Sequence, residues 1–332
     1  MFNWAVLGTG AIVKKFIKGL KAADGARVYA VCSRDLNRAE AFAEKYNIEK
    51  AYGSCEEMAE DSEIDCVYIG VPHPFHKKYM ELCIDREKNV LCEKPFTMNS
   101  GEARYIEKLA KEKQVFVMEA MWTKFLPVIQ KVKEAVNSGV IGEVQEINAS
   151  FGFFTAPNAS DRLYNLELGG GALLDVGVYP LNFAVYLMGK LPKDIYSDAS
   201  IGETGVDEIN HMTLYFENGC KTVKAHLASA LKENQGADAV IIGAKGRIEI
   251  PEFFQADKAL VYNERGELID TIAADHLLNG YEYEAAEVMG CIKEGMKQSE
   301  IHSLKDTIDI IDIADGMRQE WGLKYPADIM DK

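Results

Sequence analysis

The first third of the chain alternates short apolar runs with segments whose apolar residues recur at helical spacing. The runs contain few polar positions, which is typical of strands buried on both faces of a parallel sheet. In Leu36–Tyr46, for example, Ala39, Phe42 and Ala43 fall on one side of a helix. The pattern therefore predicts a doubly wound α/β domain. The runs are WAVLG, RVYAVCS, DCVYIGVP, NVLCEKP and VFVMEA, and helices are expected at Lys14–Ala22, Leu36–Tyr46, Cys55–Ala59, His76–Arg86 and Gly101–Lys111.

The pattern changes near Ala120, where long runs joined by two-residue turns replace the alternation. Asn218-Gly219 is a strong hairpin signal, and two further hairpins are expected at Lys245-Gly246 and Arg265-Gly266. We therefore predict a Rossmann-type α/β domain at 1–121 and an α+β domain at 122–332 with an open, mainly antiparallel sheet. Helices are expected in this second part at Pro127–Asn137, Glu282–Glu294 and Leu304–Glu320.

Composition narrows the classes of partner. The 332 residues carry a formal net charge of −15, which disfavours binding to nucleic acid or to anionic membranes. No stretch approaches the ~18 apolar residues of a membrane helix, and the first strand begins at Asn3, so we expect no signal peptide. Four of the seven cysteines lie in apolar runs, which favours buried thiols in a reducing compartment, the cytoplasm. The histidines match no metal-binding spacing, so we expect a small-molecule partner and no metal.

The turn after the first strand has the pattern of a dinucleotide site. Gly8-Thr9-Gly10 follows the strand directly, and Ala11 and Ile12 open the next helix. The first glycine permits a tight turn, the second lets a pyrophosphate approach the backbone, and helix N-terminal amides face its charge. Val13 stands where the pattern has a third small residue. A GxG alone is a weak signal, but its place in the first βα unit favours nucleotide binding over a mere strand–helix turn.

The end of the second strand indicates which dinucleotide binds. An NAD site has a carboxylate about 20 residues beyond the glycines for the ribose hydroxyls, whereas this chain has Ser33 and Arg34 there, with Arg38 one turn later. Guanidinium groups suit a 2′-phosphate because they combine charge with paired donors. The alternative is that Asp35 binds the ribose, although Asp35 is also a good N-cap for the following helix. NADP is therefore favoured, and NAD remains possible.

Two further strands end in unusual sequences, IGVPHPFH and NVLCEKPF. An ordinary strand exit would explain charges and a proline after an apolar run. However, open α/β sheets bind ligands at the carboxyl ends of their strands. We therefore expect Gly70, Val71 and Pro72, together with Glu93 and Lys94, to contact the nicotinamide half of the cofactor.

The Glu93-Lys94-Pro95 motif resembles the signature of the glucose–fructose oxidoreductase/inositol dehydrogenase (Gfo/Idh/MocA) family. The resemblance extends through MEAMWTKFLP, LGGGALLDVGVYPL, IGAKGRIEIP, GYEYE and GLKYP, so it covers nearly the whole chain. These motifs are most similar to the branch of dimeric dihydrodiol dehydrogenases and NADP-dependent xylose dehydrogenases.

The resemblance implies roles for several residues. Lys94 would face the nicotinamide and the substrate, and the Lys94-Pro95 peptide would be cis. Tyr179 aligns with the tyrosine that serves as acid/base in this branch. Asp175 would lie in the substrate site and is a third candidate catalytic residue beside Lys94 and Tyr179. His76 would lie beside the cofactor, and Trp122 would line the pocket. The second domain would form a homodimer or homotetramer through its sheet.

Each of these residues also has a structural interpretation. Tyr179 could be a core tyrosine, Asp175 could cap a helix, and Trp122 could pack at a domain interface. His76 could be structural, and Arg162, a candidate for binding substrate hydroxyls, could be a solvated loop residue. Core packing is the default for the three phenylalanines Phe151, Phe153 and Phe154, although Phe154 is also a candidate substrate contact.

Together these features predict an NADP-dependent oxidoreductase acting on a secondary alcohol or carbonyl of a sugar, cyclic polyol or vicinal diol. Tyr179 would be the acid/base, because a nearby ammonium such as that of Lys94 favours the phenolate form of a tyrosine. Two alternatives are a glucose–fructose-type enzyme that retains its nucleotide and a non-catalytic NAD(P)-binding sensor. A sensor would not require Lys94, Asp175 and Tyr179, which are all present.

Overall fold

The computed structural model of the chain describes residues 1–274 and 278–330. Within this part the chain divides into two compact units, one of residues 1–122 and 278–311 and the other of residues 123–274 and 312–330. The first unit therefore contains a segment that follows the second unit in the sequence. Each unit is described by itself below.

The first unit contains a six-stranded parallel sheet in the order β3-β2-β1-β4-β5-β6. The sequence predicted five of these strands, and β3 is a three-residue strand that carries no apolar run. The order places β1 between β2 and β4, so the direction in which strands are added reverses there. The strands are β1 (Phe2–Leu7), β2 (Ala26–Cys32), β3 (Lys50–Tyr52), β4 (Cys66–Ile69), β5 (Asn89–Glu93) and β6 (Val117–Ala120).

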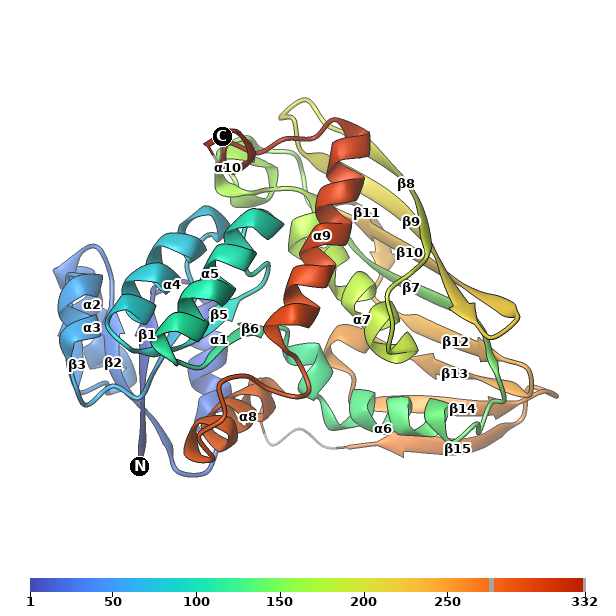
Figure 1. Cartoon of the computed structure of the whole chain (residues 1–332), viewed down its shortest axis with the longest axis horizontal. Coiled ribbons are helices and arrows are strands. Elements are labelled where there is room, and N and C mark those ends of the chain that lie inside the picture. The colour runs from blue at the N-terminus through green and yellow to red at the C-terminus, as the bar shows by residue number, and fades with distance from the viewer. Residues whose placement is uncertain (275–277, 331–332) are drawn as a thin grey trace. The chain divides into compact units, whose positions relative to one another are not determined.

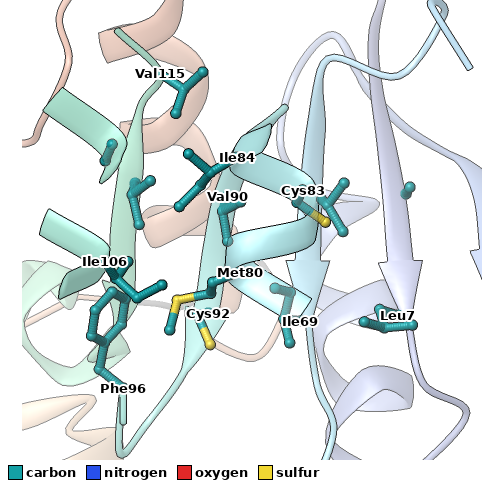
Figure 2. Close-up of a cluster of buried hydrophobic side chains, with 14 of the residues drawn as sticks. Leu7, Ile69, Met80, Cys83, Ile84, Val90, Cys92, Phe96, Ile106 and Val115 are labelled. Carbon is teal, nitrogen blue, oxygen red and sulfur yellow. The ribbon is translucent and has the colours of Figure 1, made fainter. Parts of the chain in front are cut away.

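Helices cover both faces of this sheet, which confirms the doubly wound prediction. On one face, side chains of α4 and α5 join Leu7, Val67 and Cys92 in a buried apolar cluster (Figure 2), and Figure 1 shows these two helices side by side. On the other face Phe16 of α1 lies between Trp4 and Tyr68, stacked on Tyr68 at 3.7 Å. The helices are α1 (Ala11–Leu20), α2 (Leu36–Tyr46), α3 (Cys55–Glu60), α4 (His76–Asp85), α5 (Ser100–Lys113), α8 (Tyr281–Lys293) and the start of α9 (Leu304–Trp321).

The second unit contains a nine-stranded mixed sheet with the main order β15-β14-β13-β12-β7-β10-β9-β8 and with β11 paired to β7. The three predicted hairpins are confirmed as β9–β10, β12–β13 and β14–β15. The pairing of β7 with β10 is parallel and lies at the middle of the sheet. The strands are β7 (Val144–Phe154), β8 (Asp194–Ile201), β9 (Asp207–Asn218), β10 (Lys221–Ala230), β11 (Lys232–Gly236), β12 (Ala239–Gly243), β13 (Gly246–Ile250), β14 (Lys258–Asn263) and β15 (Leu268–Ala273).

Two helices, α6 (Pro127–Asn137) and α7 (Val178–Met188), run along one face of the nine-stranded sheet (Figure 1). A π-helical turn, Leu173–Gly177, leads directly into α7. By length and composition the stretch Leu166–Met188 could cross a membrane, but 83% of its most apolar window is buried inside the protein. Its apolarity is therefore that of a core helix. The short helix α10 (Ala327–Met330) follows α9.

Candidate active site

A cavity of about 430 Å³ lies at the carboxyl ends of β1, β2 and β4, where the sequence predicted a dinucleotide. Three successive segments supply its walls: the glycine turn after β1, the residues after β2 and the residues after β4. Its lining residues are Leu7, Gly8, Thr9, Gly10, Cys32, Ser33, Arg34, Asp35, Arg38, Gly70, Val71, Pro72, Phe75 and Tyr79.

The two glycines of the turn have different roles. Gly8 has φ of +110°, and a Cβ there would lie 2.7 Å from the carbonyl oxygen of Gly70, so a side chain would separate the ends of β1 and β4. A Cβ at Gly10 would meet nothing within 4 Å, so this backbone borders open space at the start of α1. The turn therefore offers exposed backbone amides to an approaching anion, as a dinucleotide pyrophosphate requires.

The residues after β2 form the end of the cavity that carries positive charge. Arg34 and Arg38 are exposed, and the Arg34 guanidinium lies 5.8 Å from the centre of the Phe75 ring. The Asp35 carboxylate accepts a hydrogen bond from the backbone N–H of Arg38 at 3.4 Å, so it caps α2 as expected. This donor set fits a phosphate group near the adenine ribose.

Lys94 follows β5, one strand beyond β4, and its peptide bond to Pro95 is cis, as the resemblance implied. The preceding Glu93 is 6% exposed and belongs to the face covered by α1. Its carboxylate accepts hydrogen bonds from the Tyr68 hydroxyl at 2.5 Å and from the backbone N–H of Lys94 at 3.2 Å. Burial raises the pKa of Glu93 from 4.5 to about 7. Through this second hydrogen bond, Glu93 holds the backbone of Lys94 in place.

Two buried side chains hold the loop after Lys94. The His76 ring, fully buried at the start of α4, contacts the carbonyl oxygens of Pro95 at 2.9 Å and Val71 at 2.8 Å. Burial lowers the pKa of His76, so the neutral ring donates to one of the two carbonyls. On the other side the Glu119 carboxylate accepts from the backbone N–H of Phe96 at 3.1 Å. His76 thus joins the loops after β4 and β5.

Helix α8 contributes an aromatic stack and a buried carboxyl. The Trp122 ring stacks on Tyr281 with centroids 4.5 Å apart and planes 8° apart. One turn later in α8, Glu284 is fully buried, and within the described part of the chain neither of its carboxyl oxygens has a hydrogen-bond partner. Burial and then the neighbouring Glu93 raise the pKa of Glu284 well above its ordinary value. Glu284 therefore keeps its proton to a higher pH than an exposed glutamate does.

In the second unit the structure brings together Asp175 and Arg162. Arg162 lies in a short 3₁₀ turn, and its guanidinium donates to the Asp175 carboxylate at 2.9 Å. The Asp175 side chain is 10% exposed and that of Arg162 is 38% exposed, so the pair sits at the edge of buried structure. The π-helical turn carries Asp175, which therefore does not cap a helix.

Tyr179 lies in the first turn of α7 and is 7% exposed. Its ring contacts Phe151, with centroids 5.4 Å apart, and Phe254, with centroids 6.0 Å apart. These aromatic contacts fix the ring on one side of α7.

Two buried side chains, Asp207 and Tyr325, hold the segment that leads to Asp175 in place. The Asp207 carboxylate accepts from the backbone N–H of Leu173 at 2.7 Å and from the Asn210 amide at 2.8 Å. The Tyr325 hydroxyl donates to the carbonyl oxygen of Gly170 at 2.5 Å. Gly171 has φ of +122°, and a Cβ there would lie 2.3 Å from the Asp207 carboxylate. The glycines before the turn are therefore required by close packing.

Some predicted residues lie elsewhere. Ala11 and Ile12 are the first residues of α1 and do not line the cavity, and neither do His76, Glu93, Lys94 or Trp122. Core packing was wrong for Phe154, which is 65% exposed at the end of β7. Phe151 and Phe153 share one side of β7, whereas Phe154 falls on the other because side chains alternate along a strand.

Sequence reasoning missed Cys32, Phe75 and Tyr79 as cavity-lining residues. Cys32 could have been identified by its position, because it directly precedes Ser33 at the end of a strand. It also missed Glu119, which is buried and holds the loop after Lys94, and Glu284, which is buried near Glu93. Both occur in the quoted motifs MEAMWTKFLP and GYEYE.

Comparisons with known proteins agree with this fold. Residues 2–121 match the family described as "Oxidoreductase family, NAD-binding Rossmann fold", and residues 129–249 match the "GFO/IDH/MocA C-terminal domain". The chain is 36% identical to trans-1,2-dihydrobenzene-1,2-diol dehydrogenase of Xenopus laevis, covering 98% of this chain and 99% of that protein. It is 32% identical to the Homo sapiens protein of that name, with 98% of both chains covered.

Solved structures show the same fold. An aldose-aldose oxidoreductase from Caulobacter crescentus complexed with glycerol superimposes with a TM-score of 0.86 at 22% identity, covering 96% of both chains. A 3-ketoreductase from Actinomadura kijaniata, in complex with NADP and TDP-benzene, gives a TM-score of 0.83 at 24% identity over 96% of this chain and 97% of that one. With matching family domains, full-length relatives and this shared fold, the chain belongs to the Gfo/Idh/MocA family of NAD(P)-dependent oxidoreductases.

Proposed function

We propose that this protein is an NADP(H)-dependent oxidoreductase that interconverts a secondary alcohol and a carbonyl in a sugar, cyclic polyol or vicinal diol. The observation that carries the proposal is the cavity that joins the Gly8–Gly10 turn to the Arg34 and Arg38 side chains. The substrate class rests on the relatives, which are named as a diol dehydrogenase and an aldose-aldose oxidoreductase.

The strand order supports an orientation for the cofactor. Along the carboxyl edge, β2 carries Arg34, β1 carries the glycine turn, β4 carries Gly70–Pro72 and β5 carries Lys94. Guanidinium groups would bind the 2′-phosphate at one end, and the helix N-terminus would bind the pyrophosphate in the middle. The nicotinamide would then reach the ends of β4 and β5, where Lys94 is held by Glu93.

In this proposal Lys94 and Tyr179 have different roles in the reaction at the alcohol group. When bound, the nicotinamide supplies the hydride acceptor for oxidation and the hydride donor for reduction. The Tyr179 phenolate oxygen takes the hydroxyl proton during oxidation and returns it during reduction. The Lys94 ammonium favours the phenolate by charge, and Asp175, positioned by Arg162, accepts hydrogen bonds from substrate hydroxyls.

The test is turnover followed by nicotinamide absorbance at 340 nm with pentoses, hexoses, inositols and vicinal diols, each with NADP and with NAD. Tyr179→Phe should lower kcat by roughly 10²- to 10⁴-fold, the usual contribution of a general acid/base. Tyr196→Phe is the matched control, because Tyr196 is 67% exposed on β8, and it should retain full activity.

Two outcomes would oppose the proposal. Undiminished turnover of Tyr179→Phe would reject Tyr179 as the acid/base and leave Lys94 as the proton donor. Tight NADP binding with no turnover of any compound would favour a sensor or a nucleotide-retaining shuttle enzyme instead.

We also propose that the protein is a homo-oligomer that assembles through the face of the nine-stranded sheet opposite α6 and α7. A shallow hollow on that sheet is lined by side chains of β7, β9, β10 and β12, among them His211, Thr213 and His226. Sedimentation velocity should give the mass of a dimer or tetramer, and Thr213→Arg should shift it toward the monomer. A monomeric wild-type protein would refute this assembly.

The buried free thiols fit a reducing compartment, so we propose a cytoplasmic location.

A further inference from the structure

Three cysteine thiols lie together beneath the charged end of the cavity. Cys32 ends β2, Cys55 is the first residue of α3, and Cys83 lies in α4. Strand pairing sets Cys32 opposite Tyr52, three residues before Cys55. The three residues are 1%, 4% and 0% exposed and belong to one buried cluster, in which Figure 2 labels Cys83. The Cys55 side chain interacts with both of the other thiols.

One member of this trio borders the cavity. Cys32 is a lining residue, and Tyr79, which also lines the cavity, packs against the same cluster. Cys32 is therefore the member of the trio that a small solute in the cavity meets first, whereas Cys55 and Cys83 do not line the cavity. Within the described part of the chain, no group of three or more His, Cys, Asp or Glu residues is arranged to hold a metal ion, so metal binding does not explain the trio.

The three thiols differ in acidity. Interactions with Cys32 and Cys83 lower the pKa of Cys55, while the interaction with Cys55 raises the pKa of each neighbour. Cys55 is therefore the first of the three to become a thiolate, which is the form that reacts with peroxide. The pKa of Cys32 and that of Cys83 are raised above the ordinary thiol value, so these two thiols keep their protons at neutral pH.

We propose that Cys55 and Cys32 form a peroxide-sensitive thiol pair that closes to a disulfide and thereby weakens binding of the dinucleotide. The Cys55 sulfur attacks one oxygen of hydrogen peroxide, the O–O bond breaks, and the other oxygen leaves as water after protonation. The Cys32 sulfur then attacks the resulting sulfenic acid, the S–O bond breaks, and a second water leaves. Two thiols are oxidised by two electrons, and one peroxide is reduced to two waters.

The disulfide changes the cavity because of where Cys32 lies. Its neighbour Ser33 lines the cavity and donates its backbone N–H to Tyr52 of β3. Pulling Cys32 toward α3 shifts the backbone that carries Ser33 and Arg34. A dinucleotide in the cavity covers Cys32 and slows its oxidation. The effects on dinucleotide binding, and the protection by bound dinucleotide, rest on the proposed use of the cavity for the cofactor. Formation of the disulfide does not.

The experiment uses the full-length Cys220→Ser protein, because Cys220 is the exposed cysteine among the described residues and would react first. The protein is treated with hydrogen peroxide, with and without saturating NADPH, and peptide mapping by mass spectrometry follows the Cys32–Cys55 linkage. We expect a loss of two hydrogens at this pair, reversal by dithiothreitol and slower formation with NADPH. NADPH fluorescence titration should show the dissociation constant raised about tenfold or more after oxidation, a change of ~1.4 kcal/mol.

Variants identify the reacting pair. Cys32→Ser and Cys55→Ser should each abolish the linkage and the loss of NADPH affinity, whereas Cys291→Ser, a buried cysteine of α8, should change neither. The time course in the Cys220→Ser protein keeps both Cys32 and Cys55, so poor folding of a Cys32 or Cys55 variant does not decide the result. Absence of the linkage, or a linkage that leaves NADPH affinity unchanged, would overturn the proposal. A protein that forms the linkage but binds no NADPH in the reduced state would instead refute the cofactor assignment.

Discussion

Arg34 and Arg38 are the residues on which the choice of dinucleotide depends. Both line the cavity from the end of β2 and the first turn of α2, and both are exposed. Asp35 between them is used as the cap of α2, so its carboxylate is partly committed to the backbone. The site therefore presents guanidinium groups where an NAD-specific site presents a free carboxylate.

We expect Arg34→Ala to raise the dissociation constant of NADP roughly ten- to a hundredfold, because a hydrogen bond to a charged group contributes ~1.5–3 kcal/mol. The affinity for NAD, which lacks the 2′-phosphate, should change little. Fluorescence titration with NADPH and NADH measures both constants. Arg86→Ala removes the same charge outside the cavity, beside Glu60, and serves as the control. Equal losses for both dinucleotides would show that Arg34 does not read the 2′-phosphate.

At this scale the sequence identified residues with local signals and missed those that depend on burial. Gly8 was predictable because a tight turn after a strand demands a glycine, and Gly10 because a pyrophosphate must approach the backbone there. Asp35 was predictable because a cap has a fixed place in a helix. Glu284 carries no such signal, since a glutamate in a helix is normally exposed. Its burial becomes visible only in the structure, where α8 packs against α1 and Glu93 is a neighbouring carboxyl.

Among the elements, the π-helical turn at Leu173–Gly177 is the one that presents Asp175. Gly171 precedes it with φ of +122° and no room for a side chain beside Asp207. The turn is therefore held by backbone geometry on one side and by a buried carboxylate on the other.

Gly171→Ala should lower the free energy of unfolding by more than the ~1–3 kcal/mol of an unfavourable backbone conformation, because a steric clash is added. Gly205→Ala separates the two causes, since Gly205 has φ of +84° and its Cβ would meet only the Leu166 side chain, at 3.7 Å. Urea denaturation of the two variants gives the comparison. Equal losses would mean that the contact with Asp207 adds no strain.

The predicted bounds of a helix were correct where its local sequence pattern was clear. Leu36–Tyr46 and Pro127–Asn137 have the predicted bounds, because each is amphipathic and each begins at a clear start signal. Helix α7 was not predicted, because it is apolar on all sides and contains Pro180 near its start. The parallel pairing of β7 with β10 could not be read from hairpin turns, which specify only antiparallel neighbours.

At the scale of the whole molecule, the buried carboxyls Asp207 and Glu93 connect stability to pH near neutrality. Burial raises the pKa of Asp207 from 3.8 to about 7 and that of Glu93 from 4.5 to about 7. The folded state therefore binds these protons more tightly than the unfolded state, and the stabilisation is complete below pH ~4. It is lost as the pH rises through 7, and further increase has no effect through these groups.

We therefore expect the contribution of these groups to the free energy of unfolding to fall between about pH 4 and pH 7, by ~1.4 kcal/mol at most per pKa unit of each group. Asp207→Asn mimics the protonated acid and should flatten this slope, whereas Asp198→Asn, an exposed residue of the same unit, should not. Urea denaturation at a series of pH values measures the slope. An unchanged slope in Asp207→Asn would show that Asp207 ionises normally in the folded protein.

The return of residues 278–311 to the first unit has a consequence for how the protein is made. Leu304, Ile308 and Ile311 belong to the same buried cluster as residues of the strands β1, β4 and β5. The buried Glu119 carboxylate accepts a hydrogen bond from the Thr307 hydroxyl and contacts the His302 ring. A ribosome translates residue 122 long before it reaches residue 311. The part of this apolar cluster that Leu304, Ile308 and Ile311 cover therefore stays exposed until the entire nine-stranded sheet has been synthesised.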